Sequence, residues 1–261
     1  MVPKMLSFRT VAGKLMPLAL GATVVLGACA TEQRPCTAPS PDCACPTGTQ
    51  GGGTTLVVLT DKASPAFVSA MQRVTAADKK VFEDERLGLD DKPTVILVTY
   101  DALGELHEIG NFNLKGEGDT TIRKEANAKL QAACLTQAVG SVRKEASGGN
   151  LFRALGNATA LAKARSESGA AVLAFGLSRS SVEGIAVDKM DLAAPEARKN
   201  VIHELTRVGI LTPSGGVAVS FVAPAEGLES GITAGFVNRF VDDELCAAVG
   251  TGRCHRIEVL S

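Results

Sequence analysis

The sequence predicts an α/β domain of three layers, with helices on both faces of a mostly parallel, doubly wound sheet and one antiparallel strand at its edge. Several short apolar runs, of which 55–60 is the first, are typical of strands that are covered on both faces. Segments with apolar residues at helical spacing separate these runs and are long enough for right-handed crossovers. One run, 106–114, alternates between apolar and polar residues, which indicates a half-exposed edge strand.

The first half of the domain reads as strand, helix and β-hairpin. After the first strand, residues 65–87 are expected to form one helix, of which 78–86 is a charged and solvated run. The apolar run 94–100 predicts the second strand, and a short turn joins it to the alternating run 106–114.

The second half alternates between helices and buried strands. Apolar residues at helical spacing predict four helices, at 121–142, 151–161, 195–208 and 232–245. Apolar runs predict buried strands at 170–175 and 215–222, and 255–260 is expected to be a closing strand. Asn150 offers a cap for the helix that begins at 151, and the segment 176–191 is expected to be a long loop or a small excursion.

The N-terminal residues follow the plan of a bacterial signal peptide. Basic residues come first, an apolar run of 15–25 follows, and the segment Leu26-Gly27-Ala28-Cys29 resembles the lipobox of bacterial lipoproteins. This resemblance implies cleavage before Cys29 and attachment of acyl chains such as palmitate to that cysteine. Buried acyl chains would hold the protein firmly at a cell membrane or outer membrane, on its extracytoplasmic side. An uncleaved anchor and a plain secretory signal are the alternatives.

We therefore expect three parts: a signal peptide at 1–28, a flexible tether rich in Cys, Pro and Gly at 29–53, and the α/β domain at 54–261. Six cysteines remain besides Cys29, at 36, 43, 45, 134, 246 and 254. In an exported protein they favour disulfides over metal binding. Cys246 and Cys254 are the favoured pair, whereas Cys134 lies on the apolar face of its helix and is expected to be a buried thiol.

Composition argues against nucleic-acid binding. The net charge is -1, from 27 basic and 28 acidic residues, so no excess of positive charge is available for phosphates. Tyr100 is the single tyrosine and tryptophan is absent, which leaves few aromatic side chains for stacking on bases. We expect no nucleic-acid partner.

The order of strands and helices in 54–261 resembles the von Willebrand factor A-like (vWA-like) fold, although other doubly wound, Rossmann-like folds remain open. In metal-binding members of that family the first strand ends in Asp-x-Ser-x-Ser, a threonine opens a later helix, and an aspartate follows a later strand. Asp61 matches the first aspartate, and Ser64 is displaced by one position from a serine. The remaining positions depart from the pattern, with Ala63, Pro65, Asn150, and Phe175 or Gly176.

The resemblance thus implies a degenerate metal site. Asp61 and Ser64 stay as candidate ligands for Mg²⁺, but one carboxylate and one hydroxyl are a poor ligand set, so we expect no metal and no other cofactor. Asp101 ends the second strand at the same end of the sheet and could form a carboxylate pair with Asp61, or both could be turn residues. Asp101 and Asn150 are kept as possible contact residues.

No catalytic constellation stands out. The three histidines do not assemble with a serine or cysteine at recognisable spacing, and Gly-x-Ser-x-Gly is absent. The sequence favours a lipid-anchored protein of the cell envelope whose vWA-like domain binds an unidentified envelope protein, without catalysis. The alternatives are an envelope hydrolase that uses Asp61, Asp101 and Ser64, and a lipoprotein that binds a small molecule.

Overall fold

The computed structural model describes residues 39, 44–45, 53–76, 79–83, 86–89, 91–144, 149–182, 185–228, 231–250 and 253–258. The chain divides into two compact units, Met1–Arg34 and Pro35–Ser261, and all of the described residues belong to the second. The predicted signal peptide, the predicted lipidation site Cys29 and nearly all of the predicted tether lie outside the described residues. Their boundaries at 28 and 53 stay predictions.

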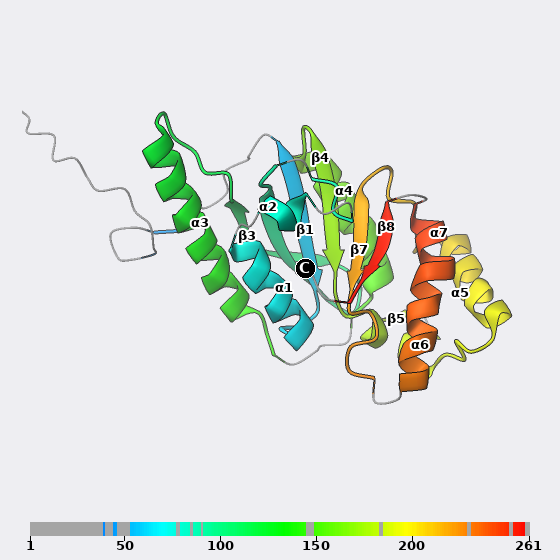
Figure 1. Cartoon of the computed structure of the whole chain (residues 1–261). Coiled ribbons are helices and arrows are strands. Elements are labelled where there is room, and N and C mark those ends of the chain that lie inside the picture. Colours follow the sequence, from blue (N-terminus) through cyan, green and yellow to red (C-terminus); the bar gives the residue numbers. More distant parts are fainter. Residues whose placement is uncertain are drawn as a thin grey trace, which may run out of the picture. The chain divides into compact units, whose positions relative to one another are not determined.

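The described domain is built on a six-stranded sheet with the order β3-β2-β1-β4-β7-β8. Its strands are β1 (Thr54–Thr60), β2 (Thr94–Tyr100), β3 (Leu106–Asn113), β4 (Gly169–Ala174), β7 (Ala218–Val222) and β8 (Cys254–Ile257) (Figure 1). β1 lies between β2 and β4 and is parallel to both, whereas the edge strand β3 pairs antiparallel with β2. The predicted class, a mostly parallel doubly wound sheet with one antiparallel edge strand, is confirmed.

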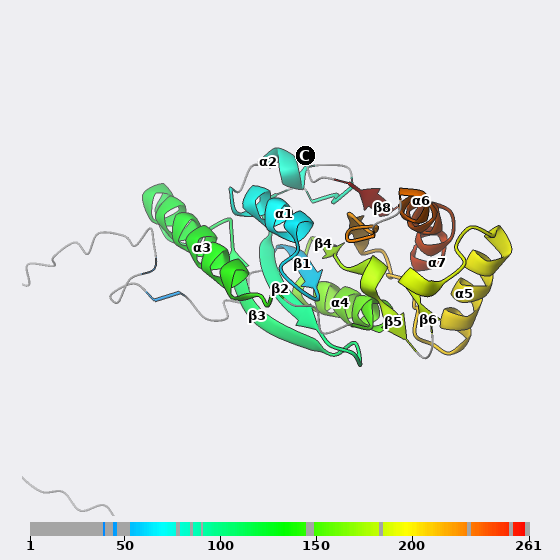
Figure 2. The same ribbon diagram turned by 90° about the horizontal axis from the view of Figure 1, so that it is seen from below.

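Every residue of β1 is buried because the strand is covered on both faces. Leu56 and Val58 pack into one apolar cluster with α1 (Pro65–Thr75) and α3 (Thr121–Ser141), and Val57 and Leu59 into another with α4 (Leu151–Arg165). Figures 1 and 2 show α1 and α3 on one face of the sheet and α4 on the other. Each such side chain contributes about 1.5–3 kcal/mol on burial, which makes β1 the centre of both halves of the core.

The predicted helix at 65–87 is wrong in its length. α1 ends at Thr75, a short helix α2 (Lys79–Phe82) follows, and the charged run predicted to be solvated contains the buried residues Val81 and Phe82. These two side chains, with Leu87 and Leu89, enter the same apolar cluster as α1. On one straight helix Leu87 would lie opposite to the face that α1 buries, whereas the break after α1 lets all four side chains enter the cluster.

The segment 176–191, predicted as a loop or excursion, contains short elements. They are η1 (Leu177–Arg179), β5 (Ser181–Val182), β6 (Ile185–Ala186) and η2 (Val187–Lys189). β5 and β6 form a small antiparallel sheet of their own. η1 matters most for the site, because it follows β4 directly and places Arg179 at the carboxyl end of the large sheet.

The helices of the second half are α5 (Pro195–Arg207), α6 (Gly231–Arg239) and α7 (Cys246–Val249), with the π-helical segment η3 (Phe240–Leu245) between the last two. Phe240 and Leu245 are both fully buried. The predicted helix at 232–245 is present, with a π-helical segment inside it.

Two disulfides lie within the described residues. Cys246–Cys254 joins α7 to β8, and this pairing was predicted. Cys45–Cys134 was not: Cys134 is buried as expected, but it is bonded to Cys45 of the predicted tether rather than being a free thiol. Disulfides of this kind are typical of proteins in an oxidising compartment outside the cytoplasm.

Within the described parts of the chain, no helix is both long enough and apolar enough to cross a lipid bilayer.

Candidate functional site

The candidate site begins in the loop that follows β1, at the carboxyl end of the sheet. Thr60 accepts a hydrogen bond from the Lys62 backbone N–H and donates its hydroxyl to the Lys62 carbonyl, at 3.3 and 2.7 Å, which makes the turn tight. Ser64 caps α1, since its Oγ accepts a hydrogen bond from the Phe67 N–H at 3.2 Å. This turn points the side chain of Asp61 into the protein, where it is fully buried.

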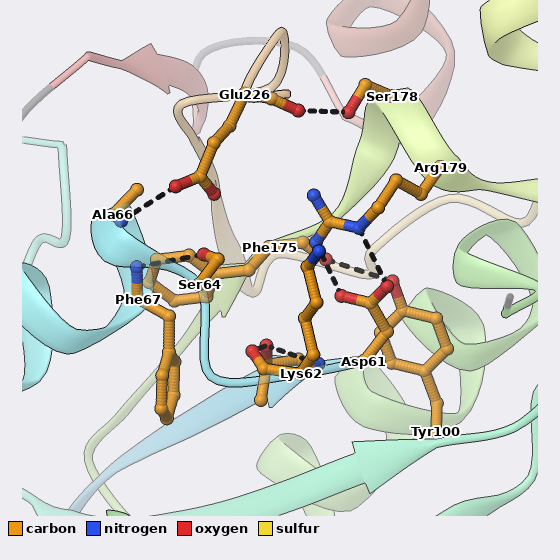
Figure 3. Close-up of polar contacts among 11 residues, drawn as sticks. Asp61, Lys62, Ser64, Ala66, Phe67, Tyr100, Phe175, Ser178, Arg179 and Glu226 are labelled. Atoms are coloured by element: carbon orange, nitrogen blue, oxygen red, sulfur yellow. Dashed lines mark hydrogen bonds and ion pairs between the residues drawn. The ribbon is translucent and has the colours of Figure 1, made fainter. Parts of the chain in front are cut away.

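Arg179 neutralises Asp61. The guanidinium group donates from Nε to Oδ2 at 2.9 Å and from Nη2 to Oδ1 at 2.6 Å, so both carboxylate oxygens are held by one side chain (Figure 3). The Arg179 side chain is 19% exposed. A forked, charge-assisted pair of this kind is among the strongest side-chain interactions, because the planar guanidinium matches the carboxylate.

Burial lowers the pKa of the Arg179 guanidinium, but the hydrogen bonds and charge of Asp61 outweigh it and leave that pKa above its usual value. The charges of Tyr100 and Glu226 act in the same direction. The guanidinium is therefore permanently charged in the folded protein. A buried carboxylate needs such a partner, because an unpaired charge in the interior is strongly destabilising.

Tyr100 lies beside this ion pair at the end of β2. Its hydroxyl donates a hydrogen bond to the Phe175 carbonyl at 3.0 Å, which joins the ends of β2 and β4 (Figure 3). Burial raises the pKa of the phenol well above its usual value of 10.0, and the charge of Asp61 raises it further, while Arg179 opposes them. The phenol is thus a neutral hydrogen-bond donor at physiological pH.

Gly176 supplies the space for this arrangement. It has a φ of +89°, and a Cβ at this position would lie 2.6 Å from Asp61 Oδ1 and 2.7 Å from the Tyr100 hydroxyl. Arg179 Nη2 would be 3.0 Å away. Only glycine combines this backbone conformation with so close an approach of three polar groups.

The loop after β7 closes the site on the side of α1. The Glu226 carboxylate accepts a hydrogen bond from the Ala66 N–H at 2.8 Å, in the first turn of α1, and the Glu226 carbonyl accepts one from the Ser178 hydroxyl at 2.6 Å (Figure 3). The neighbouring Ala223 has a φ of +43°, which is strained for a residue with a side chain. Loops from β1, β4 and β7 are thereby tied together.

Asp101 is a turn residue. Its Oδ1 accepts hydrogen bonds from the N–H groups of Leu103 and Glu105, at 2.9 and 3.0 Å, and its Oδ2 lies 3.2 Å from His107 Nε2. The hydrogen bond from Glu105, with those from His107 and Leu103, lowers the pKa of this exposed carboxyl group. Asp61 and Asp101 do line the same hollow of about 410 Å³, but each carboxylate is committed to other partners.

Asn150 caps α4, as predicted. Its Oδ1 accepts a hydrogen bond from the Arg153 N–H at 3.1 Å, and its own N–H donates to the Asp101 carbonyl at 3.0 Å. Asn150 also lines a second hollow at this end of the sheet, of about 510 Å³, together with Leu103, Arg153 and Lys189. A backbone hydrogen bond thus joins Asp101 and Asn150, the two possible contact residues.

A divalent cation does not fit the residues at the end of β1. Both oxygens of Asp61 bind Arg179, and the Ser64 hydroxyl caps α1. Phe175 or Gly176 stands where the family pattern has an aspartate, and neither has a side-chain oxygen. Within the described ranges, no group of three or more His, Cys, Asp and Glu side chains is placed to hold a metal. Mg²⁺ needs several oxygen ligands, and here they are used or missing. The absence of bound metal stays a prediction.

Sequence reasoning identified Asp61 but not its partners. Arg179 lies in the segment 176–191, where no apolar pattern related any residue to the sheet. Its one signal is chemical: an arginine five residues beyond a buried strand can reach a buried aspartate at the same end of the sheet. Tyr100 was noticed only as the single tyrosine, and Gly176 only as a mismatch to the family pattern.

No family model matches the chain, and no curated protein does. Among solved structures, the chain is similar to the vWF domain of the type V pili tip protein Mfa5 from Porphyromonas gingivalis, with 9% identity, a TM-score of 0.35, and coverage of 80% of this chain and 90% of that one. An aerotolerance-related membrane protein from Bacteroides fragilis gives 10% identity, a TM-score of 0.32, and coverage of 79% and 92%.

Proximal thread matrix protein 1 from the mussel byssus gives 11% identity and a TM-score of 0.30, and the match covers 80% of this chain. The chain spans 42% of the length of that protein.

Proposed function

We propose that this chain is a lipid-anchored protein of the cell envelope whose α/β domain binds a protein partner, without catalysis and without a metal ion. Cys29 would carry the lipid, and the loops at the carboxyl end of the sheet would contact the partner. In an open α/β sheet this end is the usual place for binding, because loops from several strands meet there.

One observation carries the non-catalytic part of the proposal: the polar groups at this end already have structural partners. Asp61 is held by Arg179, Asp101 holds its own turn, and Ser64 caps a helix. The alternative hydrolase would need these same three groups to be free for a nucleophile, an acid or a base. Releasing any of them would break a contact that positions the loop.

The surface that remains available is made of neighbouring side chains, not of the buried ion pair. Leu103 is 62% exposed, although it is a large apolar residue, and Arg153 and Lys189 lie around the same hollow of about 510 Å³. We name Leu103, Arg153 and Lys189 the carboxyl-end surface. An exposed apolar side chain that lines the same hollow as two cationic side chains suits contact with a protein surface.

The test is in-cell cross-linking of the full chain in its native envelope, comparing two matched substitutions. Leu103→Glu alters the carboxyl-end surface, whereas Ile122→Glu alters an apolar residue that is 73% exposed at the start of α3, near the opposite end of the sheet. We expect a defined cross-linked protein with wild type and Ile122→Glu, and its loss with Leu103→Glu. No defined product, or equal loss in both variants, contradicts the proposal.

A second candidate, binding of a small molecule, is favoured by a hollow of about 500 Å³ between β3 and α3. Apolar residues such as Ile109 and Phe112 line it together with Gln137, and the Cys45–Cys134 disulfide forms part of its wall. Such a mixture of apolar walls and a few polar groups is typical of ligand pockets. Native mass spectrometry of the protein purified from its own envelope would detect a retained ligand, and the apo mass alone would count against this candidate.

A further inference from the structure

We propose that Arg179 is a built-in replacement for a divalent cation: its guanidinium group supplies, from within the chain, the positive charge that the end of β1 requires. The fold resembles one in which an aspartate after the first strand binds a metal, yet here that aspartate binds an arginine with both oxygens.

The position of the guanidinium group supports this assignment. Asp61 comes from the end of β1, and Arg179 comes from η1, which follows the neighbouring strand β4. Tyr100 adds the end of β2, on the other side of β1, through its hydrogen bond to the Phe175 carbonyl. One cation thus lies where the ends of three adjacent strands meet, as a bound ion would.

The surrounding residues fit arginine and exclude an ion. Gly176 allows the guanidinium and the carboxylate to approach the backbone of the turn after β4, where a side chain would collide with both. The Asp61 side chain is fully buried and the Arg179 side chain is 19% exposed, so water has little access to the ion pair. A forked cation that delivers two hydrogen bonds satisfies a buried carboxylate without the further oxygen ligands that Mg²⁺ requires.

With arginine in place of a metal ion, the positive charge beside Asp61 is a permanent part of the chain. A bound ion leaves when its concentration falls or a chelator is added, whereas a guanidinium group with a raised pKa stays in place and stays charged. If the proposed partner binding is correct, on which this consequence alone depends, recognition at this end of the sheet is insensitive to divalent cations. The assignment of Arg179 itself depends only on the contacts above.

The test is a double-mutant cycle on the purified chain with its disulfides intact. Arg179→Ala leaves a buried, unpaired carboxylate, and Asp61→Ala leaves a partly buried guanidinium without its carboxylate, so each should lower the melting temperature by roughly 10 °C. The double variant removes both charges and should lose clearly less than the sum of the two single losses. Arg207→Ala is the matched control, because Arg207 pairs with Glu204 on the exposed surface and should shift the melting temperature little.

Chemical rescue makes the test specific to the cation. Guanidinium chloride at tens of millimolar, compared with sodium chloride at the same concentration, should raise the melting temperature of Arg179→Ala and not that of the double variant, which has no carboxylate to bind it. If Arg179→Ala does not fold, Arg179→Lys replaces it, since lysine keeps the charge but cannot bind both oxygens, and it should retain only part of the coupling to Asp61. Additive single losses, or equal effects of guanidinium on both variants, overturn the inference.

These measurements are made without a partner. A negative result here leaves the cross-linking result unchanged, and a negative cross-linking result leaves the Asp61–Arg179 coupling unchanged, so the two ideas fail separately.

Discussion

The guanidinium group of Arg179 holds both carboxylate oxygens of Asp61, at 2.6 and 2.9 Å, at the point where β1 ends. The two residues are 118 positions apart in the chain, and the pairing of β1 with β4 brings them together. It links the order of the strands to the chemistry of the site.

Gly176→Ala should destabilise the protein by roughly 3 kcal/mol, for two reasons. The alanine would have to adopt a left-handed backbone conformation, and its methyl group would displace the Asp61–Arg179 ion pair. Urea denaturation measures the change. Gly140→Ala is the control: Gly140 lies in α3, and a Cβ there would meet nothing within 4 Å. It should be neutral or stabilising by about 0.5–1 kcal/mol. A Gly176→Ala protein as stable as wild type would mean that Asp61, Tyr100 and Arg179 are not packed as described.

Tyr100→Phe removes only the hydroxyl group and should cost about 1–2 kcal/mol in the free energy of unfolding, since the buried Phe175 carbonyl loses this donor. Urea denaturation at neutral pH gives the value. An unchanged stability would show that the hydrogen bond between the ends of β2 and β4 contributes nothing.

Alkaline pH provides a second test of Tyr100. The pKa of the phenol is raised in the folded protein, so its stabilising contribution is complete below the unfolded pKa of about 10 and is lost as pH rises toward the folded pKa. Because the chain has one tyrosine and no tryptophan, ultraviolet absorbance of tyrosinate reports this residue alone. We expect ionisation to begin only with unfolding. A reversible titration of the folded protein near pH 10 would contradict the burial of Tyr100.

The Cys45–Cys134 disulfide should hold the tether on the domain even when the peptide chain between them is cut. A protease recognition sequence inserted between residues 46 and 52 would allow the peptide to be cut there. We expect the N-terminal fragment to stay attached to the domain in non-reducing gels and to separate after reduction, because the disulfide bridges the cut to α3. In a variant with Cys45→Ser and Cys134→Ser the fragment should separate at once. Separation without reductant in the unmodified chain would show that this disulfide does not form.

Cys29→Ala should release the protein from membranes, since the acyl chains implied by the lipobox-like segment would have no attachment site. Fractionation of cells into soluble and membrane parts measures this. Cys36→Ala, which leaves Cys29 in place, is the control and should stay with the membranes. Membrane association that survives Cys29→Ala would exclude lipidation as the anchor.

The sequence was informative where a residue's role follows from its neighbours in the chain. Continuous apolar runs predicted β1, β2 and β4, since a strand covered on both faces needs apolar residues at every position. Alternation predicted the edge strand β3, and Asn150 was correctly expected to cap a helix.

The sequence was uninformative where a contact joins segments that share no local pattern. The Cys45–Cys134 pair spans 89 residues and begins in a stretch rich in Pro and Gly, so no periodicity related it to α3. Val81 and Phe82 were hidden in a charged run because their burial depends on how the chain turns after α1. Arg179 follows from the order of strands, which a single sequence does not reveal.

The central claim is that the end of β1 uses an arginine where a metal ion could have been used. The most direct measurement is the melting temperature of the purified chain in EDTA and in millimolar Mg²⁺ or Mn²⁺, for wild type and for Asp61→Ala. We predict that the wild-type melting temperature is the same in all three conditions to within about 1 °C, because an ion that does not bind the folded state cannot stabilise it. A rise of several degrees with Mg²⁺ or Mn²⁺ that disappears in Asp61→Ala would contradict this account.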